Sequence, residues 1–366
     1  MTEPIKRKTT RKDIAIEAGV SISVVSRVLN DSGYVSGEKK ERVLKAVEKL
    51  GYYRDPVAFS LSRKATRQLL FYSGELENAF NIELYEGMIS EAGKNGYMIL
   101  MNGLIELNKV QDVMMDGIIL PNESVAERYM QTVGKNLHIP AVAASYGGEF
   151  HFERSMPIVE CDLWKGIEKV ITYLRKRGHR KIAMMSVYPQ NGLNQANSRI
   201  LAWRECMREY IGEEYKKYYF GICREDLLND ERALSFEKDM DRGDFTIPED
   251  FFGKGRLGAE IFVEKRSDAT AIICFNDELA LGLCRGLKEK GVRVPEDVSI
   301  MGIDGTYASR YAERKLTSLC LNPVKQGSEC VKVLMSMINR EKYKHITRIP
   351  LNIREGDTIK ELGSKP

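Results

Sequence analysis

Residues 10–30 read TRKDIAIEAGVSISVVSRVLN, and this stretch decides the fold of the amino-terminal region. Thr10 precedes Asp13 by three residues, which is the spacing of a reciprocal helix cap, and small apolar residues follow until Gly19. Ser21 then caps a second run, in which valines and a leucine recur at the spacing of one helical turn. Two short helices joined by a glycine turn predict a helix-turn-helix.

The second helix has one face that is polar apart from a single isoleucine. The side chains on or near this face are Ile22, Ser23, Ser26, Arg27 and Asn30. An arginine in the major groove can donate a bidentate pair to guanine, and an apolar side chain can contact a thymine methyl. The pattern therefore favours DNA recognition, although periodicity alone is also compatible with an ordinary three-helix bundle that has a polar face.

The charge of the first 68 residues favours a polyanionic partner. They contain fifteen lysines and arginines against eight acidic residues, whereas the rest of the chain is slightly acidic. Ser36 opens a third helix that Gly51 ends, so these basic residues belong to a small helical domain. Neutralising phosphates releases counterions from DNA and so favours binding, although a solvated surface tolerates the same charge.

From residue 69 onward, short apolar runs alternate with helical patterns. The expected strands are 69–73, 97–101, 116–120, 141–144, 181–186, 270–275 and 298–303, and the expected helices include 82–94, 164–177, 197–211, 277–290 and 325–340. Such alternation predicts parallel α/β sheets, and about 300 residues suffice for two of them. Ligands of such sheets bind at the carboxyl ends of the strands.

The run from Thr10 to Asn30, with the later Gly51-Tyr52, closely resembles the DNA-binding head of the lactose-repressor (LacI/GalR) family. Body motifs such as Asp116–Leu120 and Val298–Asp304 resemble its effector-binding core, which is similar to periplasmic sugar-binding proteins. The resemblance implies a transcriptional regulator, most often a repressor, whose homodimer binds a near-palindromic operator. The DNA contacts that it implies are Thr10, Ser21, Ile22, Ser23, Ser26, Arg27, Asn30, Tyr34, Ser36, Tyr52 and Leu61.

Residues 56–64 resemble the hinge helix of this family, which folds in the minor groove of DNA. Leu61 matches the leucine that wedges between base steps and kinks the duplex. Two positions depart from the family pattern, because Arg54 replaces a usual proline and Phe59 replaces a common basic or amide residue. We expect these departures to weaken the affinity of the hinge for DNA.

For the body, the resemblance implies effector contacts at Ser145, Arg199, Asn276 and Asp304. Fork-shaped arginine donors and aspartate acceptors suit a sugar or a related polyhydroxylated metabolite. Ser145 stands where an aspartate often binds a sugar hydroxyl, which leaves room for another ligand or for none. Such an effector would lie between the lobes and control operator affinity, and some members of the family also use a co-repressor protein.

The expected fold is an N-terminal all-α helix-turn-helix head followed by a two-lobed, periplasmic-binding-protein-like α/β effector domain with parallel sheets. The expected boundaries are 1–58 for the head, 59–68 for the hinge, 69–161 with 321–341 for the first lobe, and 162–320 with 342–366 for the second lobe. The stretch 102–115 is shorter than the loop and helix that the family has there. We therefore expect a trimmed first lobe, with an altered dimer geometry or an altered site for a partner protein.

Several classes of protein and site have no support in the sequence. No apolar run approaches the roughly 20 residues of a membrane span, so we expect a cytoplasmic protein that associates with the nucleoid when bound to DNA. Seven scattered cysteines and four histidines show no ligand spacing, and no catalytic motif appears, so we expect no metal, cofactor or enzyme activity. The alternative is a cytoplasmic ligand-binding protein, or an enzyme, with an accessory basic head.

Overall fold

The protein is described here by a computed structural model. The structure describes residues 9–63, 65–73, 78–103, 105–135, 138–147, 156–189, 197–223 and 248–363. The chain forms two compact units, Met1–Thr66 and Arg67–Pro366.

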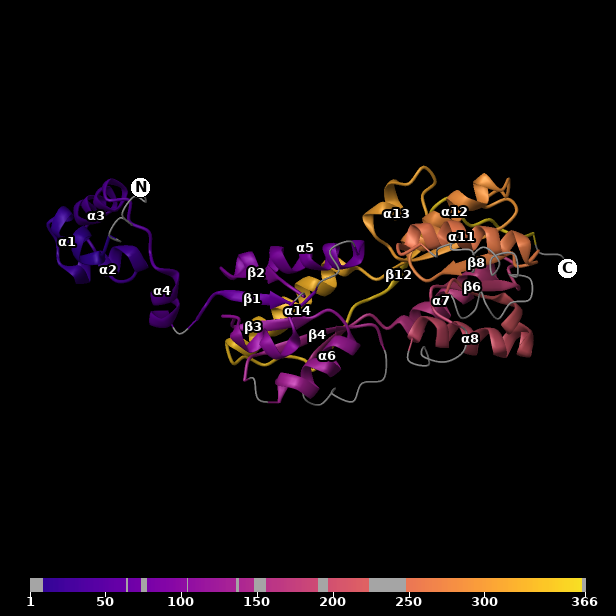
Figure 1. The fold of residues 1–366 in the computed structure, drawn as a ribbon, viewed down its shortest axis with the longest axis horizontal. Helices are drawn as coiled ribbons and strands as arrows, with labels where there is room; N and C mark the ends of the chain where they lie inside the picture. The colour runs from indigo at the N-terminus through magenta and orange to yellow at the C-terminus, as the bar shows by residue number, and fades with distance from the viewer. Residues whose placement is uncertain are drawn as a thin grey trace, which may run out of the picture. The chain divides into compact units, whose positions relative to one another are not determined.

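The first unit is helical. Its elements are α1 (Arg11–Ala18), α2 (Ile22–Asn30), α3 (Gly37–Lys49) and α4 (Pro56–Arg63) (Figure 1). The predicted reciprocal cap of α1 is confirmed, since the Thr10 hydroxyl accepts a bond from Asp13 N and the Asp13 carboxylate accepts one from Thr10 N. Gly19, at φ +60°, ends α1 and turns the chain into α2. Ile14 and Val25 are fully buried where these helices meet.

The first lobe of the second unit is built on a parallel sheet. Among the described residues its strand order is β11 (Ile346–Arg348), β5 (Ile158–Glu160), β4 (Ala141–Ser145), β3 (Gly117–Leu120), β1 (Gln68–Phe71) and β2 (Met98–Met101). Helices α5 (Ala79–Lys94) and α14 (Pro323–Ile338) cover one face, and η1 (Leu107–Asp112), α6 (Glu123–Tyr129) and η2 (Met130–Gly134) cover the other (Figure 1). Leu69 and Phe71 pack on the α5 side and Leu70 on the opposite side, because neighbouring side chains of a strand alternate between faces.

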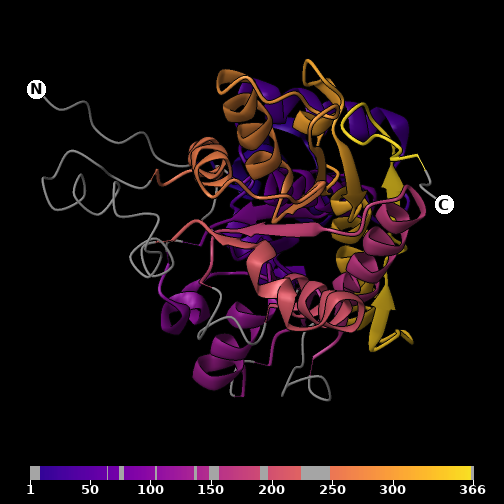
Figure 2. The same ribbon diagram turned by 90° about the vertical axis from the view of Figure 1, so that its right-hand side faces the viewer.

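The second lobe repeats this design. Its described strands run in the order β12 (Asn352–Arg354), β10 (Thr317–Cys320), β9 (Ser299–Asp304), β8 (Ala271–Cys274), β6 (Ile182–Ser186) and β7 (Tyr219–Gly221), and β12 is antiparallel to β10. Helices α11 (Phe251–Glu264) and α12 (Asp277–Glu289) lie on one face, and α7 (Leu163–Lys176) and α8 (Ser198–Ile211) on the other (Figure 2). The short elements η3 (Gly212–Tyr218) and α13 (Tyr307–Tyr311) complete the lobe.

Helices α5 and α14 approach each other closely through two glycines. A Cβ atom on Gly87 would overlap the carbonyl oxygen of Val324, and one on Gly327 would overlap that of Leu84. Only glycine permits such a backbone approach. The two helices therefore form one rigid layer on the first sheet.

The structure corrects one predicted boundary. Residues 342–366 were assigned to the second lobe, but β11 pairs with β5 in the first sheet, so the chain returns to the second lobe only after Arg348. Helix α4 begins at Pro56, as the hinge-helix resemblance of residues 56–64 predicts, although the expected domain boundary placed the start of the hinge at residue 59. The stretch 102–115 contains only the short η1, which agrees with the expected trimming of the first lobe. Three-residue strands carry too little periodicity to be found from sequence.

Candidate DNA-contacting face and interlobe site

The face of α2 that was predicted to contact DNA is exposed. Ile22 has 49% of its surface exposed, and Ser23 and Arg27 are also exposed. Val25 and Val28, on the opposite side of the helix, are buried in the head core. The core thus fixes the orientation of α2 while its polar face remains open to a partner.

Four of the predicted contacts take part in hydrogen bonds within the head: Thr10, whose bonds with Asp13 cap α1, and three serines. The Ser21 hydroxyl accepts a bond from Val24 N and lies 2.8 Å from the hydroxyl of Ser23. The Ser26 hydroxyl accepts a bond of 3.2 Å from the guanidinium of Arg11. These hydroxyls are therefore held in place before DNA arrives.

The remaining predicted contacts are scattered around this face. Asn30 Oδ1 is buried and has no hydrogen-bond partner among the described residues, whereas Tyr34 is 89% exposed. Ser36 caps α3 by position, but its side chain makes no capping bond. Tyr52 is partly buried against the head core. Leu61 lies within α4, and its side chain is outside the described residues.

Arg54 lies close enough to Arg11 and Arg63 for their charges to interact. Burial lowers the pKa of Arg54, and the positive charges of Arg11 and Arg63 lower it further. The sequence analysis noted Arg54 only as a departure from the family's proline and did not predict these interactions.

In the body, the structure brings together two of the predicted effector residues. Arg199 lies in the first turn of α8, where Asn197 Oδ1 accepts a bond from its backbone N–H. Its guanidinium Nη2 lies 3.3 Å from Oδ1 of Asp304, the last residue of β9. Burial raises the pKa of Asp304 well above its usual value, and the charge of Arg199 opposes this rise. The Nε–H of Arg199 is buried without an acceptor among the described residues.

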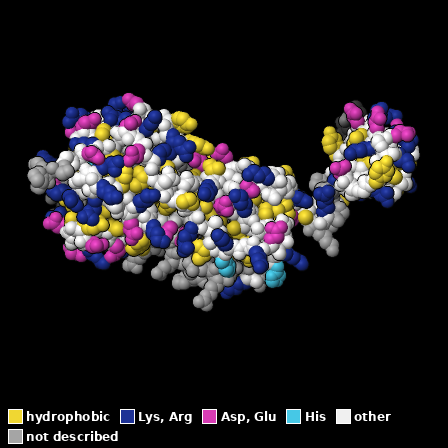
Figure 3. All heavy atoms as spheres, turned by 180° about the vertical axis from the view of Figure 1, so that it is seen from behind, with side chains coloured by type: hydrophobic (Ala, Val, Ile, Leu, Met, Phe, Trp, Pro, Cys, Tyr) yellow, Lys and Arg dark blue, Asp and Glu magenta, His cyan; other side chains and the backbone are white. Residues whose placement is uncertain are grey.

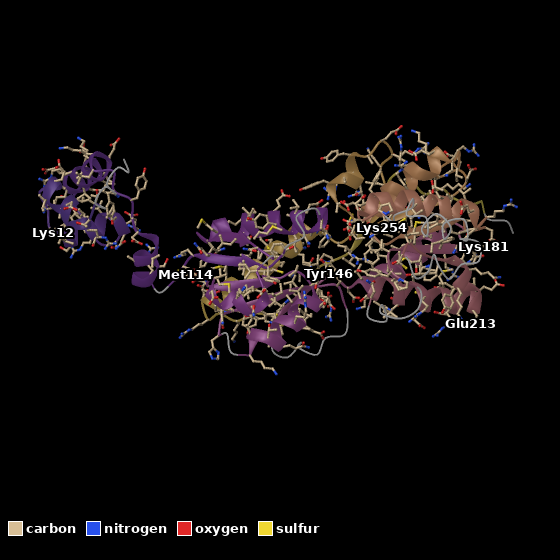
Figure 4. The ribbon with its side chains drawn as sticks, in the orientation of Figure 1. Lys12, Met114, Tyr146, Lys181, Glu213 and Lys254 are labelled. Carbon is tan, nitrogen blue, oxygen red and sulfur yellow. The ribbon has the colours of Figure 1, made fainter. Side chains whose placement is uncertain are left out.

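Aromatic rings surround this ion pair. The guanidinium carbon of Arg199 lies 4.5 Å from the ring centre of Phe275 and 5.7 Å from that of Tyr146. Tyr188 packs edge-on against Phe275, and Phe80 of α5 packs against Tyr146. Figure 4 shows Tyr146 at the end of the first lobe that is closer to the second lobe. We call Ser145, Tyr146, Arg199, Phe275 and Asp304 the interlobe site.

The first lobe contributes a partly buried carboxylate next to Ser145. Glu123, at the start of α6, accepts a bond from Tyr146 N. Burial raises the pKa of Glu123, while its bonds to Tyr146 N and to the Ser145 hydroxyl lower it. Ser145 itself is fully buried, and its hydroxyl accepts a bond from Gly147 N. The Glu123 carboxylate therefore lies near the hydroxyl of Ser145, the residue that stands where the family often has an aspartate.

Among the described residues, no recorded hydrogen bond joins Asn276 to Arg199 or Asp304. Its Oδ1 accepts a bond of 2.8 Å from Leu279 N and caps α12. The sequence missed Glu123, Tyr146 and Phe275, each of which follows the end of a strand by one to three residues. The rule that ligands bind at the carboxyl ends of parallel strands could have identified them.

Other chemistry has little support in the described part of the chain. No disulfide joins the cysteines of the described residues, and no group of ligating side chains there could hold a metal ion. The ring nitrogens of buried His179 lie within hydrogen-bond distance of Thr270 and of the Lys360 carbonyl, which indicates a structural role.

Within the described residues, no helix combines the length and apolar character that crossing a bilayer requires. On the face drawn in Figure 3, acidic and basic side chains are intermixed over the body.

The chain is similar to known bacterial regulators over nearly its whole length. Residues 10–55 match bacterial regulatory proteins of the lacI family, and residues 171–359 match the periplasmic binding protein-like domain. The HTH-type transcriptional regulator RegA of Clostridium acetobutylicum is 30% identical over 360 residues, covering 95% of this chain and 98% of that protein. The HTH-type transcriptional repressor PurR of Vibrio atlanticus is 28% identical, covering 96% and 99%.

A solved structure has the same architecture. The lac repressor dimer, bound to operator and the anti-inducer ONPF, matches with a TM-score of 0.75 at 20% identity, covering 97% of this chain and 100% of that chain. The head and the two parallel-sheet lobes thus define a DNA-binding transcriptional regulator with a periplasmic-binding-protein-like core. The chain belongs to the LacI family of bacterial regulators. The predicted family and fold class are confirmed, and these relatives are regulators rather than enzymes.

Proposed function

We propose that this chain is a cytoplasmic, homodimeric repressor whose operator affinity is set by a small molecule bound at the interlobe site. The observation that carries the proposal is the buried pair of Arg199 and Asp304, held against the ring of Phe275. An arginine Nε–H that is buried without an acceptor is costly, and a ligand oxygen would satisfy it.

The effector that we propose is a sugar or a related polyhydroxylated metabolite. Arg199 offers donors, Asp304 and Glu123 offer acceptors, and hydroxyl groups satisfy both. The rings of Phe275 and Tyr146 can pack against the apolar face of a pyranose or furanose. Two similar solved structures, which share only the fold with this chain, are described with bound ribose and as a cellobiose complex.

A calorimetric panel of pentoses, hexoses and disaccharides tests this assignment on the intact protein. We expect at least one sugar to bind, and we expect Arg199→Ala to abolish its binding. Glu355→Ala, which removes an exposed carboxylate of the second lobe, serves as the control. Absence of binding across the panel would reject the carbohydrate class, and binding that survives Arg199→Ala would reject the site.

For DNA, we propose that α2 lies in the major groove with Ile22, Ser23 and Arg27 facing the bases, and that α4 acts as the hinge. Selection from a random duplex pool at near-physiological salt tests this arrangement. A two-fold symmetric motif is the expected result, because each protomer would bind one half-site. A motif without symmetry, or no enrichment, would contradict the dimeric operator-binding function.

The dimer surface that we propose is formed by α5 and the edge strand β2. Ile82 and Ile89 are exposed on α5, seven residues apart and thus on one face, and Met98 is 60% exposed at the start of β2. The Tyr85 hydroxyl donates to Ile99 O and links the two elements. Apolar side chains beside an unpaired strand edge favour association.

Sedimentation of the intact protein tests this surface. Ile89→Glu should shift the dimer towards monomer, whereas Ile16→Glu, at a site 71% exposed on the head, should not. A co-repressor protein stays a prediction of the sequence resemblance alone.

A further inference from the structure

One contact joins the two lobes at the outer end of the interlobe site. Glu83 Oε1 on α5 accepts a bond of 2.6 Å from Tyr307 N, the first residue of α13. The Tyr307 hydroxyl donates a bond of 3.2 Å to Glu86 Oε2, one turn further along α5. Glu83 is only 3% exposed, so this pairing satisfies a nearly buried carboxylate. These bonds connect a helix of the first lobe to a segment that begins in the second lobe.

The segment that ends at Tyr307 starts at the interlobe site itself. Asp304, the partner of Arg199, is separated from Tyr307 by Gly305 and Thr306 alone. Asp304 and Gly305 have φ angles of +114° and +74°. A buried aspartate in this region is strained, and its conformation must be held by its surroundings.

Those surroundings fix the segment at each residue. The carboxylate of Asp277 accepts bonds of 2.8 Å from Thr306 N and 3.1 Å from the Thr306 hydroxyl. The carbonyl of Gly305 accepts bonds from the guanidinium groups of Arg310 and Arg354. Because the short segment is pinned in this way, a displacement of Asp304 is carried to Tyr307 rather than absorbed between them.

On the other side of the contact, α5 is equally well fixed within the first lobe. Its glycine-mediated packing against α14 makes the two helices move together. A hollow of about 360 Å³ lies against the contact and is lined by residues that include Glu83, Arg310 and Lys325. The bonds between the lobes can therefore break without opening a packed core.

We infer that Glu83, Glu86 and Tyr307 form a latch that transmits the state of the interlobe site to α5. The ligand displaces Asp304, and the fixed segment carries this displacement to Tyr307. Tyr307 then strengthens or breaks its bonds to Glu83 and Glu86, which changes the position of α5. Since α5 also carries the proposed dimer surface, the latch couples the ligand to the relation between protomers. The latch rests on the proposed function, because it has a role only in a ligand-controlled operator-binding dimer.

The coupling is reciprocal, so operator DNA must act back on the segment. We would measure amide hydrogen exchange of residues 304–311 in the intact protein, with and without a saturating duplex obtained by the random-pool selection. We expect bound operator to change exchange in this segment by about fivefold or more. Tyr307→Phe, which removes a single oxygen, and Glu83→Ala should reduce the response to less than about twofold.

Two controls separate a latch from a merely structural contact. Glu83→Gln keeps an acceptor for Tyr307 N and should restore the response. Tyr173→Phe removes an equivalent bond of 3.1 Å, from Tyr173 to Glu355, that lies within the second lobe, and should leave the response intact. If the wild-type segment ignores bound operator, or both latch variants respond fully, the latch is wrong while the repressor function stands. If no operator is selected at all, the proposed function fails and the latch falls with it.

Discussion

The head and the interlobe site each present an arginine to a proposed partner, but they hold it in opposite ways. Arg27 is exposed on the outer face of α2, and the head core lies on the other side of the helix. Arg199 is 14% exposed, pairs with Asp304 and lies over Phe275. An exposed arginine can be substituted without disturbing the fold, whereas a buried arginine interacts with all the side chains around it. Substitutions on the exposed face of the head should therefore reduce DNA binding, and substitutions among the buried polar residues of the body should reduce the free energy of unfolding.

The strongest test of this contrast is Asp277→Ala in the body. Asp277 is 1% exposed and accepts bonds from Thr306 N, from the Thr306 hydroxyl and, at 2.5 Å, from the Ser318 hydroxyl. Its removal leaves buried donors unsatisfied, so we expect the free energy of unfolding to fall by about 3 kcal/mol. Urea denaturation of the intact protein measures this change.

The control for that experiment is Glu313→Ala, which removes an exposed partner of Lys288. Exposed ion pairs contribute little, so no measurable change in the denaturation midpoint is expected. If the fold does not survive Asp277→Ala, the milder Ser318→Ala should show a loss in the same direction. Equal stability of the Asp277 variant and the control would remove the contrast between body and head.

The next largest effect belongs to Arg27→Ala in the head. If Arg27 makes a bidentate base contact, its loss should weaken specific operator binding by about 1–3 kcal/mol, which is roughly fivefold to 150-fold. Binding to a scrambled duplex should change much less, because phosphate contacts remain. Fluorescence anisotropy with both duplexes measures the difference, and thermal unfolding should be unchanged. A fall in melting temperature together with unaltered operator affinity would reverse the assignment of Arg27.

A smaller effect tests how well the caps of the head were identified. Thr10→Ala removes a hydroxyl that accepts a bond from Asp13 N, and should lower the local opening free energy of α1 by about 1 kcal/mol. Ser36→Ala is the matched control, since Ser36 occupies the capping position of α3 without a capping bond. Hydrogen exchange of residues 11–18 and 37–49 in the intact protein compares the two. Equal losses at both caps would mean that the side-chain bond of Thr10 contributes nothing.

The same contrast explains which features could be predicted from the sequence. The head depends on local signals such as the Thr10 cap and the Gly19 turn, and both lie where they were expected. The longer strands and helices of the body were also found, because their periodicity extends over several residues. The interlobe site was found only in part: Tyr146, Phe275 and the neighbouring Glu123 were not identified, although each follows the end of a strand. The strand-end rule indicates that such residues lie at the ligand edge of a sheet. Which of them meet there depends on the order of the strands, and a single sequence does not state that order.

The smallest expected effect concerns pH and separates the units once more, because the first 66 residues contain no histidine. Burial lowers the pKa of His179 below its usual value of 6.5, so the folded body holds this ring neutral. On unfolding below that pH the ring takes up a proton, and the body should therefore lose stability as the pH falls from 6.5. The loss attributable to His179 is at most about 1 kcal/mol over the first pH unit, and it is absent above pH 7. His179→Gln should make the free energy of unfolding of the body less dependent on pH below 6.5. The hydrogen-exchange protection of α1 to α3 in the head should not change with pH in the same way. A pH profile that is identical in wild type and variant would show that His179 titrates alike in the folded and unfolded chains.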